Sequence, residues 1–289
     1  MTKTKLKVEV YKSICNPFFV SALIIGGLFS LVNVTESILR ARKLSIQIID
    51  TIRENIGYPI SASFEGISLF LSWLPLHRVG LGSSLFFMAM PILAAMPYGW
   101  SYSDERHSGY IYQTITRMGK QSYFFSKYLS VFLSGGLAVL IPLIFDLLLT
   151  ALFCPDVPLQ ITDMLTPILN YSLFGELFYT NRWLYVILLC SVEFLWGGSI
   201  ACMTFFAGTV FRYGVLIVIM PFVVLLSVDY LSMIASGIIA SFRPIQILQL
   251  CQPVSTYYNP GWLSIAVPCS LILLSFCFGY IHNNTNELV

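Results

Sequence analysis

The sequence predicts an all-α integral membrane protein with six transmembrane helices, and three observations lead to this fold class. Of the 289 residues, 57% are apolar and 10% are charged, whereas about 25% of residues are charged in an ordinary soluble domain. Six apolar runs have about the length that a helix needs to cross a bilayer. Trp and Tyr stand at the ends of several runs, as is typical of a membrane–water interface. A soluble domain is excluded because so few charged side chains could not cover its surface.

The six runs define one transmembrane domain over residues 1–289. The predicted spans are Phe18–Val34, Leu81–Trp100, Tyr128–Phe153, Trp183–Val210, Tyr213–Ile234 and Trp262–Ile281. The first run is short and the fourth is long, so we expect tilted helices or interfacial ends. Residues 1–16 precede the first span as an interfacial segment. Within it, Leu6, Val10 and Ile14 share one face of a predicted amphipathic helix, although residues 5–10 also alternate like a strand.

Both termini are predicted to be cytoplasmic. This orientation places nine Lys and Arg inside and seven outside, and the inside ones crowd into residues 3–12 and 106–127. Charges close to the ends of spans weigh most in setting orientation. The predicted location is therefore the cytoplasmic membrane of a bacterial cell. The net charge of +2 argues against nucleic acid as a partner, because nucleic acid needs a concentrated basic face.

Long segments lie on the predicted outer side. Within residues 35–80, Ile38, Ile49, Ile52 and Ile56 fall on one helical face, which predicts an amphipathic helix on the outer surface. The stretch Ile67–Leu76 is apolar but short; it is an interfacial helix or a seventh span, which would invert everything after it. Residues 235–261 contain three prolines, which predicts a broken or re-entrant element.

Three carboxylates lie within the predicted spans, namely Asp146, Glu193 and Asp229. A carboxylate at membrane depth is costly, so it is a functional candidate by default. Glu193 lies nearest the middle of the bilayer, where it either faces a translocation path or makes a structural hydrogen bond to a neighbouring helix. Asp146 and Asp229 lie toward the outer ends and are expected to reach water. The glycine pairs at 26–27 and 135–136 are predicted to be sites of close helix packing.

The inner loop over residues 101–127 holds an ordered set of residues. Glu105 and Arg106 are followed by Gly109, Arg117 comes before an aromatic pair, and Lys127 stands at the mouth of the third span. Considered alone, the loop is a cytoplasmic connection with a basic end, as the distribution of positive charge predicts.

Taken together, these five residues resemble the loop after the second helix of ABC-2-type permeases. These permeases are the membrane subunits of one class of ATP-binding-cassette transporters. The order of spans and the broken outer segment before the last span are also similar to that family, over the whole chain. The sequence departs from the family pattern at Tyr110, where Thr is usual, and in lacking a Pro before Arg117.

The resemblance implies that residues 101–127 form a coupling loop whose short helix docks on an ATP-binding subunit. The candidate coupling residues are Asp104, Glu105, Arg106, Gly109, Tyr110, Tyr112 and Arg117. Asp104 and Glu105 are expected to place negative charge at the positive end of this helix. Tyr110 and Tyr112 are expected to anchor in an apolar groove of the partner, as aromatic side chains commonly do.

The chain is not predicted to be an enzyme. It has no phosphate-binding GxxxxGK[ST] loop and no hydrolase or zinc-protease motif, so ATP and Mg²⁺ belong on a partner subunit and no cofactor is expected here. The seven Cys and three His show no metal-ligand spacing. The predicted partners are ATP-binding subunits, a second permease copy or paralogue, and membrane lipids.

The predicted function is export of an amphiphilic peptide or of a lipid-like or drug-like molecule. Two alternatives remain open. One is a membrane immunity or sensor protein, which the sequence does not distinguish from a permease. The other is a stand-alone secondary transporter, for which inverted repeats would be expected.

Overall fold

The computed structural model describes residues 2–54, 68–77, 80–156, 168, 172–238, 246–252 and 261–285. Within these ranges the regular structure is entirely helical. Five of the described helices are long and apolar enough to cross a membrane. They are α2 (Pro17–Glu54), α7 (Lys120–Phe153), α9 (Arg182–Val210), α10 (Gly214–Ile238) and α12 (Leu263–Thr285). This agrees with a multi-pass helical membrane protein.

The second predicted span corresponds to a shorter helix, α4 (Leu81–Ala95), of 15 residues. At 1.5 Å per residue it is about 22 Å long, against about 30 Å for the hydrocarbon core of a bilayer. The chain turns at residues 96–100 and continues as α5 (Ser101–His107). The apolar run up to Trp100 therefore combines a helix with a turn.

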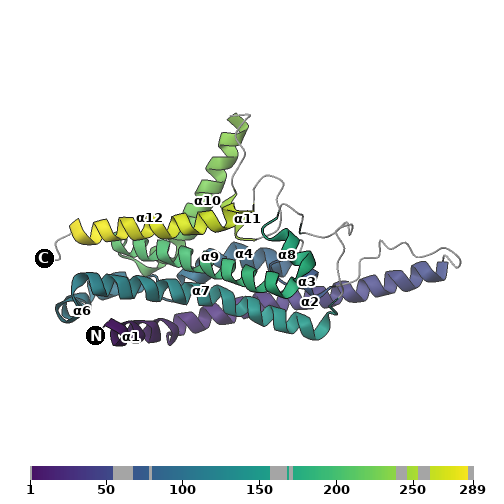
Figure 1. The fold of residues 1–289 in the computed structure, drawn as a ribbon, viewed down its shortest axis with the longest axis horizontal. Coiled ribbons are helices and arrows are strands. Elements are labelled where there is room, and N and C mark those ends of the chain that lie inside the picture. Colours follow the sequence, from purple (N-terminus) through teal and green to yellow (C-terminus); the bar gives the residue numbers. More distant parts are fainter. Residues whose placement is uncertain are drawn as a thin grey trace.

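Two helices are longer than the spans predicted for them. α2 runs unbroken from Pro17 to Glu54 and extends beyond the bundle (Figure 1). The predicted amphipathic helix on the outer surface is therefore not a separate helix, because its residues up to Glu54 continue α2. No Gly or Pro interrupts the chain between the apolar span and this amphipathic stretch. Helix α7 begins at Lys120, eight residues before the predicted third span, directly after Gly119.

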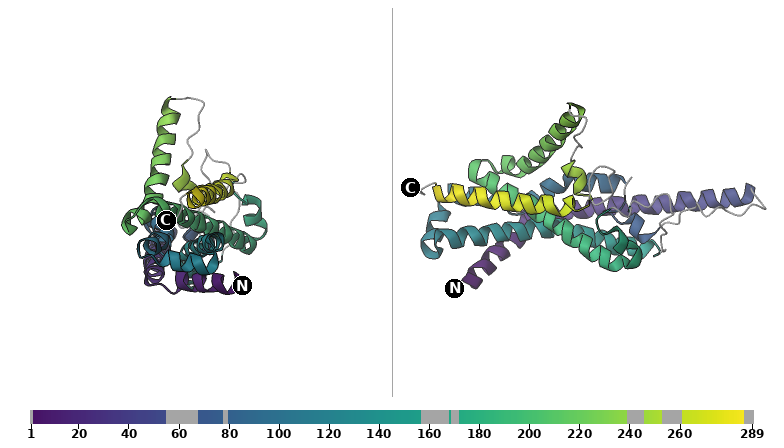
Figure 2. Two further views of the ribbon diagram at one scale, coloured as in Figure 1. Left: turned by 90° about the vertical axis from the view of Figure 1, so that its left-hand side faces the viewer. Right: turned by 45° about the horizontal axis from the view of Figure 1, so that its top comes forward.

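The remaining long helices match their predictions more closely. Helix α9 agrees with the fourth span to within one residue at its start, where the Asn181 side chain accepts a hydrogen bond from the N–H of Leu184. Residues 2–14 form α1 (Thr2–Ile14), so the helical alternative for this segment is confirmed. Helix α1 and the final turn of α12 lie at the same end of the bundle (Figures 1 and 2).

Close packing of α7 on α9 forms the centre of the bundle. A Cβ atom added at Gly135 would lie 2.3 Å from the Cβ of Ala201 and 2.9 Å from the carbonyl oxygen of Gly197. Only glycine allows the backbones to approach this closely. Gly26 is similarly tight, with Pro142 at 2.5 Å, whereas a Cβ atom at Gly27 would meet no described residue within 4 Å. The predicted packing role therefore holds for Gly26 and Gly135 but not for Gly27.

The short elements α3 (Leu69–Ser72) and α8 (Gly175–Thr180) lie at the opposite end from α6 (Tyr110–Met118) (Figure 1). Helix α3 has only four residues, and Phe70 within it and Trp73 directly after it are fully buried. The stretch around it is thus neither an interfacial helix nor a seventh span, because its side chains pack inside the protein.

Helix α10 leaves the bundle after its first half (Figures 1 and 2). Its buried residues are Ile217, Pro221 and Leu225. Farther along, the carboxylate of Asp229 accepts hydrogen bonds from the backbone N–H groups at the start of α11 (Ile247–Leu250). The predicted broken element thus overlaps α10 and α11, and its three prolines lie outside the described residues.

Candidate functional site

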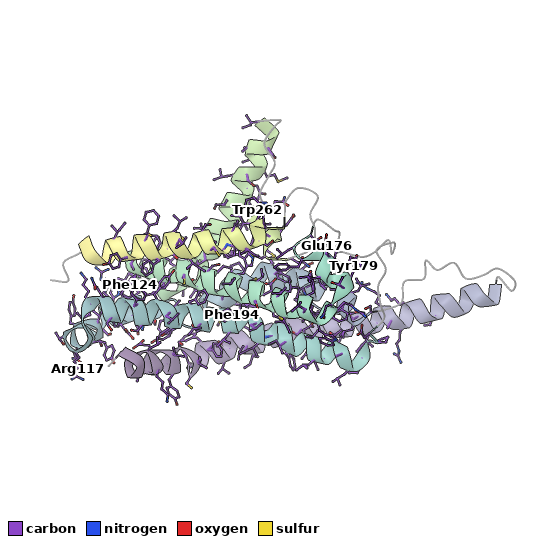
Figure 3. The ribbon with its side chains drawn as sticks, in the orientation of Figure 1. Arg117, Phe124, Glu176, Tyr179, Phe194 and Trp262 are labelled. Carbon is purple, nitrogen blue, oxygen red and sulfur yellow. The ribbon has the colours of Figure 1, made fainter. Side chains whose placement is uncertain are left out.

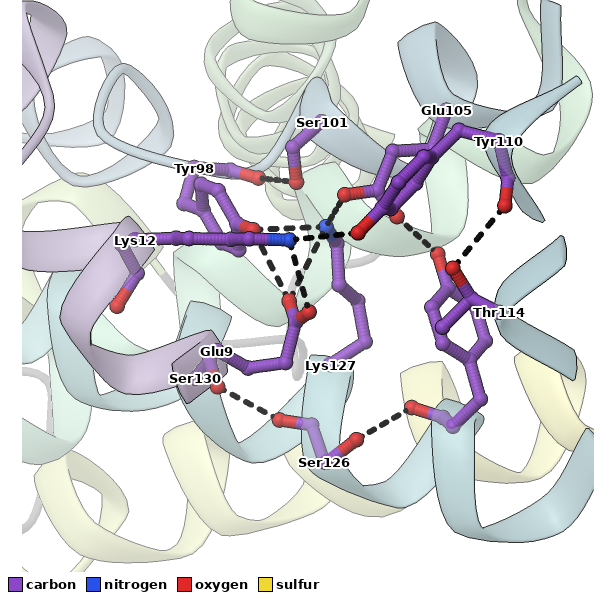
Figure 4. Close-up of polar contacts among 12 residues, drawn as sticks. Glu9, Lys12, Tyr98, Ser101, Glu105, Tyr110, Thr114, Ser126, Lys127 and Ser130 are labelled. Atoms are coloured by element: carbon purple, nitrogen blue, oxygen red, sulfur yellow. Dashed lines mark hydrogen bonds and ion pairs between the residues drawn. The ribbon is translucent and has the colours of Figure 1, made fainter. Parts of the chain in front are cut away.

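A buried ionic cluster lies where α1, α5 and α7 meet. We use this name for Glu9, Tyr98, Glu105, Tyr123 and Lys127, whose contacts Figure 4 shows. Three separate segments of the chain supply these residues: the N-terminal helix α1, the turn at residues 96–100 together with α5, and the first two turns of α7.

Lys127 is the centre of the ionic cluster. Because α7 begins seven residues earlier, at Lys120, Lys127 lies about two turns inside the helix, and its side chain is fully buried. Its Nζ lies 2.7 Å from Oε1 of Glu105 and 3.5 Å from Oε2 of Glu9. One ammonium group therefore links two carboxylates from distant parts of the sequence.

Two tyrosines complete the hydrogen bonding of the ionic cluster. Tyr98 accepts a hydrogen bond from Lys127 at 2.9 Å and donates one to Glu9 at 3.0 Å. Tyr123 donates to the second oxygen of Glu105. Burial and the nearby carboxylates of Glu9 and Glu105 raise the pKa of Tyr98 well above its usual range. The phenol therefore stays protonated and available as a donor.

Helix α1 presents a polar surface to the bundle. Glu9 is 3% exposed and Ser13 is fully buried, while the predicted apolar face, Leu6, Val10 and Ile14, is only half-buried. The periodicity thus predicted the helix, but the residue at the centre of its buried face is Glu9. It is buried because Lys127 and Tyr98 are in reach, and a charge of this kind is otherwise too costly to bury.

The coupling loop forms two helices instead of one. Helices α5 and α6 are separated at Gly109, whose φ of 73° lies in the left-handed region that glycine adopts without strain. Asp104 lies in the first turn of α5, as predicted for the start of the coupling helix. Glu105 lies in the second turn, so the same prediction was wrong for Glu105. Asp104 is exposed and lines a small cavity of about 220 Å³.

The other candidate coupling residues divide into inward and outward groups. Glu105 belongs to the ionic cluster, and Arg106 donates a hydrogen bond to the carbonyl oxygen of Thr209 at 3.2 Å. Tyr110 and Tyr112 are 43% and 44% exposed, and Arg117 lies on the same helix, α6, at one end of the bundle (Figure 3). The rings of Tyr110 and Tyr112 thus present exposed area to a partner, whereas Glu105 and Arg106 are held by contacts directed into the bundle.

Tyr110 also connects α6 to α1. The ammonium of Lys12 donates to its hydroxyl at 3.3 Å and lies 4.9 Å from the centre of its ring. Burial alone would lower the pKa of Lys12, but the Glu9 carboxylate and the Tyr110 hydroxyl outweigh it and raise this pKa. The Lys12 side chain is therefore charged, and it joins the exposed helix α6 to the ionic cluster.

Glu193 lies in the middle of α9 and is fully buried. Neither of its oxygens has a hydrogen-bond partner among the described residues, and the same is true of the Tyr185 hydroxyl and the Trp196 indole N–H. These three side chains fall within about 80° of one another around the helix. The structural alternative required a hydrogen bond from Glu193 to a neighbouring helix, and none is present in the described part of the chain.

Asp146 belongs to a second buried polar group at the far end of the bundle. Its carboxylate accepts hydrogen bonds from the Asn33 amide at 3.1 Å and from the Leu74 N–H at 2.8 Å, and its side chain is fully buried. The Asn33 oxygen lies 2.6 Å from Nδ1 of His77. The prediction that Asp146 reaches water was wrong, because Asn33 and the turn after α3 supply the hydrogen bonds that water would otherwise make.

The sequence predictions missed several residues of these sites, namely Glu9, Tyr98, Tyr123, Asn33 and His77. Glu9 had a visible signal, as the single carboxylate in a basic amphipathic helix. Among the described residues, no group of three His, Cys, Asp or Glu side chains could hold a metal ion. All seven cysteines are free thiols.

No family model, no curated protein and no solved structure matches this chain.

Proposed function

We propose that this chain is the permease subunit of an ATP-binding-cassette transporter of the ABC-2 type. In this proposal, the short helices α5 and α6 within residues 101–127 receive a separate ATP-binding subunit, which holds ATP and Mg²⁺. A second copy or a paralogue completes the pathway, and the cargo is an amphiphilic molecule. The chain's own lack of a phosphate-binding loop fits a division of labour of this kind.

The observation that carries the proposal is the arrangement of the coupling loop. Helix α6 turns Tyr110 and Tyr112 outward, while Ile111 between them is fully buried and fixes the helix to the protein. This geometry suits docking, because exposed aromatic side chains on a fixed helix supply contact area at little entropic cost.

The ionic cluster gives a docked partner a route to the transmembrane helices. A displacement of α5 moves Glu105, which is bonded to Lys127 two turns inside α7. Helix α7 packs in turn on α9 through Gly135 and Gly197, and α9 carries Glu193. A partner that moves α5 would thus act on the helix with the unpartnered carboxylate, which is the candidate contact for the cargo.

Substitution of Tyr112 tests the proposal. Tyr112→Ala removes an exposed ring and should weaken binding of the ATP-binding subunit by about 2 kcal/mol, close to thirtyfold in affinity. The measurement is co-purification of the proposed ATP-binding subunit, together with transport-coupled ATP hydrolysis. Glu105→Ala is less suitable because it also breaks the ionic cluster.

The matched control is Tyr11→Ala on α1, where the ring is 68% exposed at the same end of the protein but outside the coupling loop. It should leave binding unchanged. Wild-type recovery of the ATP-binding subunit with Tyr112→Ala, or equal losses in both variants, would contradict the coupling role of α6.

A further inference from the structure

A groove between α1, α7 and α12 lies on the outside of the bundle, at the end that carries the coupling loop. Its volume is about 690 Å³, and its lining includes Leu6, Phe125, Leu129, Phe276 and Tyr280. This volume is within the range of roughly 300–1,000 Å³ for small-molecule sites. The groove uses none of the residues of the ionic cluster.

The groove changes from polar to apolar along its length. Gln121 and Ser122 form its outer end, where the Gln121 amide donates a hydrogen bond to the Tyr280 hydroxyl at 3.3 Å. One and two turns deeper along α7 the lining becomes Phe125 and Leu129. A ligand that fills this groove must therefore be polar at one end and apolar at the other.

The depth of the groove matches one leaflet of a bilayer. From Gln121 to Leu129 the helix rises by about 12 Å, and half of the hydrocarbon core of a bilayer measures about 15 Å. Phe125 and Leu129 are 59% and 40% exposed, so these apolar side chains face the membrane without being covered by the protein. An acyl chain that lies along α7 fits this depth.

The floor of the groove is rigid. The Tyr128 hydroxyl donates to the carbonyl oxygen of Ile272 at 2.8 Å, which ties α7 to α12. The ring of Phe276 lies 5.3 Å from that of Phe125 and stacks on Tyr280 at 6.1 Å. The ring of Phe124, which is 1% exposed, lies 5.8 Å from that of Phe276 and 6.2 Å from that of Tyr280. A preformed concave surface of this kind differs from the ordinary convex surface of a helix in lipid.

The charge beside the groove favours an anionic headgroup. Helix α1 carries four Lys and one Glu, and the Glu is taken up by the ionic cluster. Lys7 follows the groove residue Leu6 and is exposed. Basic residues at this level of a membrane attract anionic lipids.

We propose that this groove is a specific site for one anionic glycerophospholipid of the bilayer, with an acyl chain along Phe125 and Leu129 and the headgroup near Ser122 and Lys7. The site does not depend on the proposed transport function. A lipid bound there holds α1 against α7 and α12.

Lipid titration of the delipidated protein in detergent tests the proposal, with native mass spectrometry as the readout. Phosphatidylglycerol should bind at one saturable site per chain. Leu129→Ala should weaken this binding about threefold or more because it removes groove contacts, and Ser122→Trp should block the site. The matched control, Leu148→Ala, changes a 62% exposed leucine elsewhere on α7 and should have no effect.

A second arm tests the headgroup. Lys7→Gln should weaken binding of phosphatidylglycerol while leaving phosphatidylcholine with the same acyl chains unchanged. Binding that never saturates, or equal losses of affinity in Leu129→Ala and Leu148→Ala, would show that lipids contact the groove no more specifically than the rest of the helix surface. A dimer that Ser122→Trp dissociates would show that a second copy covers it. Each of these results would overturn the assignment.

Discussion

Removal of the Lys127 charge is the sharpest test of the ionic cluster. In Lys127→Met, the carboxylates of Glu9 and Glu105 stay buried but lose the ammonium that lies 3.5 and 2.7 Å from them. Loss of one partner from a buried pair costs about 3–5 kcal/mol. We expect a loss near the lower limit, about 3 kcal/mol, because the Glu105 side chain retains 14% exposure and can regain some hydration.

The assay is unfolding in mixed detergent, followed by circular dichroism. Neutralising both carboxylates in the same chain, with Glu9→Gln and Glu105→Gln, should recover most of the loss, since the uncompensated charges are then gone. The control is Arg40→Met, which breaks an exposed Arg40–Glu36 pair on α2 and should cost about 0.5 kcal/mol or less. A loss of less than about 1 kcal/mol in Lys127→Met, or no recovery in the triple variant, would refute the reasoning.

Three further predictions follow from other buried groups. Glu193→Leu should raise thermal stability, since both carboxylate oxygens are buried without a hydrogen-bond partner among the described residues, and should abolish the proposed transport; a lower melting temperature would show that Glu193 has a structural partner. Gly135→Ala should cost about 1–3 kcal/mol through the clash with Ala201, whereas Gly27→Ala should leave the melting temperature unchanged; equal melting temperatures would contradict the close approach of α7 and α9. Burial and the nearby Arg40 charge lower the pKa of His77 to about 4, and the unfolded chain therefore binds more protons between about pH 6.5 and pH 4. Stability should fall over this interval by up to about 3 kcal/mol, and His77→Gln should remove that dependence.

The extent of each helix could be predicted where apolar composition and helix signals coincide. The start of α9 is one such case, because Asn181 caps the helix just before Trp183 begins the apolar run. The start of α7 was missed because residues 120–127 mix polar and aromatic side chains, which a hydropathy argument assigns to a loop. Helix formation itself tolerates such residues, and the break comes only at Gly119.

The candidate sites were harder to predict because their partners are far apart in sequence. Lys127 looked like a residue at the mouth of a span, and its burial depends on Glu9, 118 residues earlier. Asp146 looked accessible to water, and its burial depends on Asn33, 113 residues away. Charge and hydropathy evaluated over a short stretch of sequence do not detect such pairs, because each residue taken alone appears too polar to bury.

The position of the ionic cluster has a consequence for how the two ends of the bundle respond to force. A hydrogen-bonded ion pair in a low-dielectric site resists separation more than apolar contacts do, because attraction between charges is stronger there than in water. At the Lys127 end, the ion pairs join α1, α5 and α7. At the Asp146 end, hydrogen bonds join α2, α7 and the turn after α3. Helix α7 is thus held by polar contacts near both ends, and between them it packs tightly on α9 through the glycine contacts. Motion of α5 would therefore be passed through Lys127 to α7 and on to α9, where neither oxygen of Glu193 has a hydrogen-bond partner in the described part of the chain.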